Sequence, residues 1–110
     1  MKSYIQVTTT TENKKQAQTI AQYLVEAKLA ACVQIIGPIN SIYRWKGKVE
    51  NAQEWLCLIK TQDDFYNKVE AAIKSQHPYE TPEIIAVPIV KGSKKYLKWI
   101  EDELNNKAEG

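Results

Sequence analysis

The residues best suited to chemistry lie together in one short segment, His77-Pro78-Tyr79-Glu80-Thr81-Pro82-Glu83. This segment holds the only histidine of the chain, one phenol and two carboxylates. A residue that precedes proline is pushed out of the α-helical region, so His77 and Thr81 are expected to be extended. The segment is therefore predicted to be a shaped loop, and any chemistry of the protein is expected to centre on it.

Three interpretations of His77 are open: it orders the loop through hydrogen bonds, lines a pocket without metal, or ligates a metal. A metal site here would take its other ligands from Cys32, Glu80 and Glu83. One imidazole with one or two carboxylates makes a weak, unselective site for Cu(II) or another divalent cation. Cys32 has an alternative interpretation as a small buried thiol at the start of a strand.

A ligand pocket is predicted from Lys60, Tyr79 and Glu54. Two interpretations of Lys60 and Glu83 are open, because opposite charges form surface ion pairs as readily as they line binding sites. In the first interpretation, the two residues form an ion pair at a strand edge. In the second, they are opposite walls of a pocket between subunits, which Tyr79 also lines.

Composition limits the class of protein. The 110 residues, 44% hydrophobic and 25% charged, predict one globular domain over residues 1–110. The first residues alternate between polar and apolar, so neither a signal peptide nor membrane insertion is expected, and the expected location is the cytoplasm. The net charge is +2, and only one of the 15 basic residues is an arginine, Arg44. Because nucleic-acid recognition depends on arginine, no nucleic-acid partner is expected.

The first half of the chain is predicted to form a strand, a helix and a long hairpin. Alternation of β-branched residues predicts a strand over 4–10, and helical spacing predicts a helix over about 12–28. Thr10 or Thr11 is expected to cap that helix. A long strand is expected over 31–45, with a kink or bulge at Gly37-Pro38 and a turn at residues 45–48 into a return strand.

The second half predicts a helix, a strand and a final helix. Thr61 or Asp63 is expected to cap the first of these helices, and Ser93 the last. Because Pro88 lacks a backbone N–H, the strand predicted over 84–90 is expected at a sheet edge or a bulge. The order βαββαβ plus a C-terminal helix predicts an α+β ferredoxin-like sandwich, with two helices on one face of a four-stranded antiparallel sheet.

The central hairpin is longer than this fold needs. Its tip carries Tyr43, Arg44 and Trp45, and aromatic and arginine side chains are enriched in buried interface cores. An isolated two-stranded ribbon is only marginally stable in water. We therefore expect another copy of the chain to cover the hairpin.

Five segments, in this order, carry a resemblance to a known family: Ala30-Ala31-Cys32-Val33, Ser41-Ile42-Tyr43-Arg44-Trp45-Lys46-Gly47-Lys48, Leu58-Ile59-Lys60-Thr61, the His77 loop with Ile84-Ile85, and Tyr96-Leu97-Lys98-Trp99. The chain resembles the CutA divalent-cation tolerance proteins over nearly its whole length. The resemblance implies a cytosolic homotrimer of ferredoxin-like subunits, related in architecture to the PII signalling trimers. It also implies a link to tolerance of copper and other divalent ions, without established catalytic activity.

The metal site proposed for that family is incomplete in this chain. Where some similar proteins have a cysteine and a second histidine, this chain has Thr8 and Gln76. A hydrolytic triad is not expected either, since no serine has an elbow-like setting and one histidine must serve as base. We therefore expect a trimeric binding protein for divalent cations, not an enzyme. The alternative is a PII-like sensor that binds a small anionic ligand between subunits.

Overall fold

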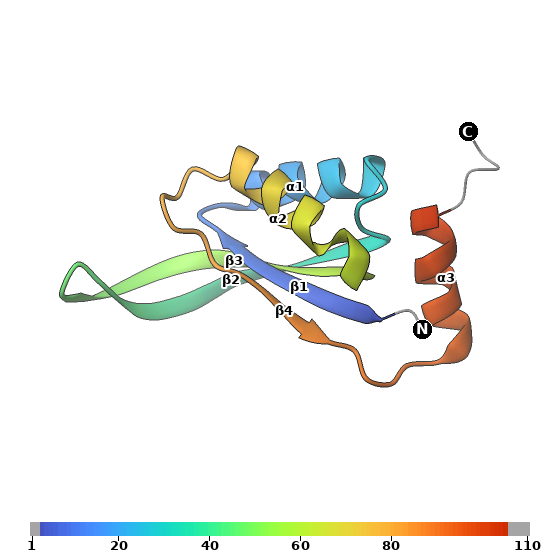
Figure 1. Ribbon diagram of the computed structural model, residues 1–110. Helices are drawn as coiled ribbons and strands as arrows, with labels where there is room; N and C mark the ends of the chain where they lie inside the picture. Colours follow the sequence, from blue (N-terminus) through green and yellow to red (C-terminus); the bar gives the residue numbers. More distant parts are fainter. Residues whose placement is uncertain (1–2, 106–110) are drawn as a thin grey trace.

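Four strands and three helices make up the computed structural model, which describes residues 3–105 (Figure 1). The strands are β1 (Tyr4–Thr11), β2 (Cys32–Trp45), β3 (Lys48–Gln62) and β4 (Ile84–Pro88). The helices are α1 (Lys14–Glu26), α2 (Tyr66–Gln76) and α3 (Lys94–Asn105), with a short 3₁₀ helix (Asp63–Phe65) before α2. The strand order is β2-β3-β1-β4 with every neighbouring pair antiparallel, so the predicted ferredoxin-like α+β fold is confirmed.

The hydrophobic core lies between the sheet and the pair of helices α1 and α2, which cover one of its faces (Figure 1). Alternation along the strands selects the core residues, because successive side chains point to opposite faces. Val7 and Ile59 are opposite each other in the β1–β3 register, and both are fully buried. The buried side of each helix packs against these strands, through Ile20 and Leu24 on α1 and Ile73 on α2.

The starts of two helices differ from prediction. α1 is capped by Asn13, whose side chain accepts a hydrogen bond from the Gln16 N–H at 2.9 Å. Thr11 instead donates its hydroxyl to the Asn13 carbonyl at 2.8 Å. The cap predicted at Thr61 or Asp63 is also wrong, because the chain enters α2 through the 3₁₀ helix and no side chain caps it.

The C-terminal part follows the prediction more closely. Ser93 accepts a hydrogen bond from the Tyr96 N–H at 3.2 Å, and α3 buries Ile100 and Leu104. β4 ends at Pro88, earlier than predicted, and is an edge strand, where a residue without an N–H is tolerated. None of the helices within residues 3–105 has both the length and the apolar character needed to cross a bilayer.

The hairpin of β2 and β3 extends well beyond the two covering helices (Figure 1). Its strands have 14 and 15 residues, whereas a usual strand has about 5–6. The register shifts between Ile36 and Ile39, which confirms the predicted bulge. Lys46 and Gly47 close the turn with φ values of 50° and 80°. Two positive φ values are what a two-residue type I′ turn requires.

The sheet face opposite α1 and α2 is only partly covered. α3 packs across one end of it, where the Asn105 side chain donates a hydrogen bond to Gln62 at 3.2 Å. Along the rest of this face, Ile36, Ile85 and Val87 remain 48%, 53% and 47% exposed. The subunit thus leaves an apolar strip of its sheet in contact with solvent.

Both cysteines are free thiols. Cys57 lies in the core, and burial raises its pKa to about 11, so the thiol is neutral at physiological pH. Cys32 is only half-buried, at the start of β2, so its interpretation as a small buried thiol holds in part. Burial, and then the charge and hydrogen bond of Cys32, raise the pKa of Tyr96, which stacks on Trp99 with ring centroids 5.6 Å apart.

Candidate functional site

His77 ties the predicted loop to β1. Its Nε2 donates a hydrogen bond to the Thr10 carbonyl oxygen at 2.6 Å, and its Nδ1 accepts one from the Tyr79 N–H at 3.2 Å. These two contacts place the proton of the neutral ring on Nε2 and occupy both ring nitrogens. The backbone at His77 is extended, as expected before Pro78, and its side chain is buried. These contacts favour the loop-ordering interpretation of His77.

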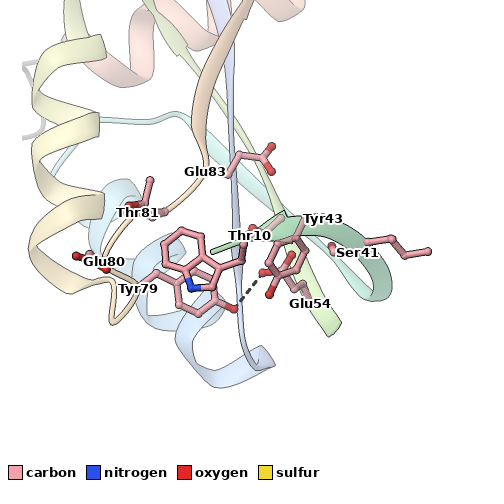
Figure 2. A pocket seen from close by; sticks show the side chains of 11 residues that line it. Thr10, Ser41, Tyr43, Glu54, Tyr79, Glu80, Thr81 and Glu83 are labelled. Atoms are coloured by element: carbon pink, nitrogen blue, oxygen red, sulfur yellow. Dashed lines mark hydrogen bonds between the residues drawn. The ribbon is translucent and has the colours of Figure 1, made fainter. Parts of the chain in front are cut away.

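Tyr79 links the loop to the hairpin. Its hydroxyl donates a hydrogen bond to Oε2 of Glu54 on β3 at 3.0 Å (Figure 2). Burial, and then the hydrogen bond and charge of Glu54, raise the pKa of Tyr79 far above its ordinary value. The phenol therefore stays neutral and remains a donor to Glu54 throughout the physiological pH range.

A cleft of about 650 Å³ lies between the loop and the hairpin (Figure 2). Pockets for small molecules usually measure about 300–1,000 Å³. Three carboxylates line it, those of Glu54, Glu80 and Glu83, and its lining within residues 3–105 includes no lysine, arginine or histidine. Three carboxylates create a negative potential, which the Lys46 ammonium, 5.8 Å from the ring of Trp45, offsets only in part. The cleft is therefore suited to cations rather than anions.

The predicted ligand pocket is formed only in part. Tyr79 and Glu54 meet in the cleft, but Lys60 lies six residues further along β3. At the rise of an extended strand this is about 20 Å from Glu54. The Lys60 ammonium donates a hydrogen bond to the Gln34 side chain at 2.7 Å. Within one subunit, Lys60 thus pairs with Gln34 and does not line this cleft, and the pocket predicted between subunits stays a prediction.

The four predicted metal ligands are divided between places. Glu80 and Glu83 line the cleft with exposed side chains, whereas His77 spends both ring nitrogens on backbone groups. Cys32 lies at the opposite end of β2 from the cleft. In the described part of the chain, no three His, Cys, Asp or Glu side chains gather closely enough to hold a metal ion together. The metal role of these four residues stays a prediction.

The hairpin tip contributes more to the cleft than the sequence suggested. Tyr43 and Trp45 were predicted, with Arg44, as interface anchors, and both of these aromatic side chains line the cleft. Ser41, which was not predicted, lines it as well. The signal for Ser41 was present in the strand alternation, since residues two apart project from the same face.

These features define an α+β protein of ferredoxin-like topology, with a long hairpin and an acidic cleft beside it. The sequence profile of the family described as CutA1 divalent ion tolerance protein matches residues 5–103. Divalent-cation tolerance protein CutA of Thermus thermophilus is 45% identical over 93 residues, which cover 84% of this chain and 90% of that protein. The chain therefore belongs to the CutA1 divalent ion tolerance protein family, as its resemblance implied.

Two further comparisons agree. The Mus musculus Protein CutA is 46% identical over 91 residues, which cover 83% of this chain but 51% of that protein, so this chain spans about half of the mouse relative. The solved structure of the periplasmic divalent cation tolerance protein CutA from Archaeoglobus fulgidus has a TM-score of 0.87 and 39% identity. That match covers 94% of this chain and 99% of the other.

Proposed function

We propose that this protein contributes to tolerance of divalent cations by binding them weakly, Cu(II) among them, in the acidic cleft. The observation that supports this proposal is the cleft's charge, which comes from three carboxylates with no cationic side chain in its described lining. A negative cleft raises the local concentration of cations and lowers that of anions. The same charge works against the alternative, a PII-like sensor for a small anionic ligand.

Glu80 and Glu83 are the proposed cation ligands. Both residues line the cleft and have exposed side chains, which an ion can reach from solvent. Two carboxylates without an imidazole or thiol form a weak site that follows the general preference for Cu(II) over Zn²⁺. His77 could join them only by giving up a backbone hydrogen bond, and Cys32 lies too far along β2 to do so.

Replacing both ligands tests the cation site. We expect the double variant Glu80→Gln, Glu83→Gln to bind Cu(II) at least about tenfold more weakly, because it loses two charged oxygen ligands. Titration calorimetry with a competing chelator measures the affinity. Glu103→Gln, an exposed substitution on α3, is the matched control. Equal affinity in the double variant and the control would refute the site, and equal affinity in His77→Ala and wild type would remove His77 as a ligand.

We also propose that the protein acts as a homotrimer. Two surfaces of the subunit support an assembly: the apolar strip of Ile36, Ile85 and Val87, and the half-exposed aromatic side chains of Tyr43 and Trp45. Exposed apolar patches beside a long ribbon are typical of interfaces between subunits. Tyr43, Arg44 and Trp45 are the proposed anchors.

Light scattering tests the assembly. We expect a mass near three times the subunit mass of 12.6 kDa at micromolar concentration. Trp45→Ala is expected to shift the mass toward the monomer on dilution, because it removes a large apolar anchor. A wild-type mass equal to one subunit would contradict the proposal.

A binding role rather than catalysis, and a cytoplasmic location, complete the proposal. The family and its Thermus thermophilus member are named for tolerance of divalent cations, and neither name refers to a reaction. Their locations vary, since the Archaeoglobus fulgidus protein is described as periplasmic and an Arabidopsis thaliana relative as chloroplastic. Fractionation of cells that produce the full-length protein tests the location.

A further inference from the structure

Glu54 is a buried carboxylate that forms no ion pair with any residue of 3–105. It is only 7% exposed, and its hydrogen-bond partner in the described chain is the neutral hydroxyl of Tyr79. Removing a charge from water costs several kcal/mol unless an opposite charge or several hydrogen bonds compensate it. One phenol supplies a single hydrogen bond and no charge. The Glu54 side of the cleft therefore has room for, and gains from, a positive group.

Aromatic rings line the same cleft. Tyr79, Tyr43 and Trp45 line it together with Glu54, and Figure 2 shows the Tyr79 hydroxyl directed at the Glu54 carboxylate. Aromatic faces attract cations, most strongly those that shed their water easily. The Trp45 ring already lies 5.8 Å from the Lys46 ammonium, which occupies at most one of its two faces.

The shape of the cleft favours an organic cation at this position over a bare metal ion. A metal ion needs several oxygen or nitrogen ligands that converge within about 2–2.6 Å of one point. Glu54 has a phenol and aromatic carbons beside it, and the cleft volume of about 650 Å³ suits a small molecule. An ammonium on a carbon chain satisfies both surroundings, since its charge pairs with the carboxylate and its methylenes contact the rings.

We infer that the cleft binds an organic ammonium ion, with its charged group beside Glu54 and its carbon chain against Tyr43 and Trp45. A diamine carries a second ammonium for the exposed carboxylates of Glu80 and Glu83, which line the same cleft. This ligand class goes beyond the proposed divalent-cation site, which uses only those two exposed carboxylates.

Calorimetry with putrescine tests this inference. We expect wild type to bind putrescine and not butanediol of the same chain length, because only the diamine carries charge. Glu54→Gln keeps the side-chain shape and is expected to weaken putrescine binding at least about tenfold. Glu103→Gln on α3 is the matched control and should bind as wild type does. Equal binding of putrescine and butanediol, or an unchanged affinity in Glu54→Gln, overturns the inference.

A second measurement needs no variant, in case Glu54→Gln folds poorly. Amide NMR spectra of the wild-type protein during a putrescine titration should change at residues 41–45, 54 and 79–83. No change, or changes confined to other regions, overturns the inference. So does a crystal structure in which a lysine or arginine of another copy pairs with Glu54. The two proposals can fail separately. If the protein binds Cu(II) but not putrescine, the proposed cation site stands and the ammonium site at Glu54 is refuted. If the Glu80 and Glu83 variant binds Cu(II) as well as wild type does, the cation site is refuted and the ammonium site is not affected.

Discussion

Gly37→Ala is expected to destabilise the folded protein by about 3 kcal/mol, the upper part of the usual range for overpacking. A Cβ atom at Gly37 would overlap Cε3 and Cδ2 of the Trp55 indole on the neighbouring strand. Trp55 cannot retreat easily, because its ring packs against the core and lies under the Lys14 ammonium at 5.7 Å. Urea unfolding at a fixed protein concentration measures the change.

Gly92→Ala is the matched control for this substitution. Its Cβ would meet only the flexible end of Leu97, with the nearest atom at 3.1 Å, so the side chain can move aside. We expect a change within about 0.5 kcal/mol, as for ordinary surface substitutions. If Gly37→Ala changes the free energy of unfolding as little as Gly92→Ala does, the close packing of Trp55 on Gly37 does not contribute to the stability of the fold.

His77→Ala is expected to cost about 3 kcal/mol of stability and to loosen the loop over residues 77–83. The substitution leaves the Thr10 carbonyl and the Tyr79 N–H without their partner, and each buried unpaired group costs about 1–3 kcal/mol. Urea unfolding measures the stability, and hydrogen exchange at the Tyr79 amide measures the loop.

Gln76→Ala, at the end of α2 beside His77, serves as the control and should leave the Tyr79 amide protected. If His77→Ala also leaves this amide protected and the stability unchanged, the two hydrogen bonds of the imidazole do not order the loop. The Tyr79–Glu54 contact would then have to hold the loop in place by itself.

The elements of the fold could be predicted because each has a strong local pattern. The alternation in β1 and the helical spacing of Ile20 and Leu24 fix element type without reference to the rest of the chain. Helix caps were less predictable, because neighbouring hydroxyl and amide side chains compete for the same backbone groups. Thr11 and Asn13 illustrate this competition, since the first bonds a carbonyl and leaves the cap to the second.

The site could be predicted only in part, because it depends on contacts between distant segments. The loop was identified from its composition, but its position is set by the bond from His77 to Thr10, which are 67 residues apart. Lys60 and Glu54 share a strand, and their separation along it follows from strand geometry. A pocket between subunits that brings Lys60 of one copy to the cleft of another stays a prediction, because it depends on contacts between copies of the chain.

The three tryptophans report on three different parts of the subunit. Trp45 lines the cleft, Trp55 packs against the bulge and the core, and Trp99 stacks on Tyr96 beside the end of the sheet. Their intrinsic fluorescence is therefore a sum of signals from separate regions. Variants that retain one indole each would resolve ligand entry, core melting and release of the C-terminal helix as separate optical transitions, without any added dye.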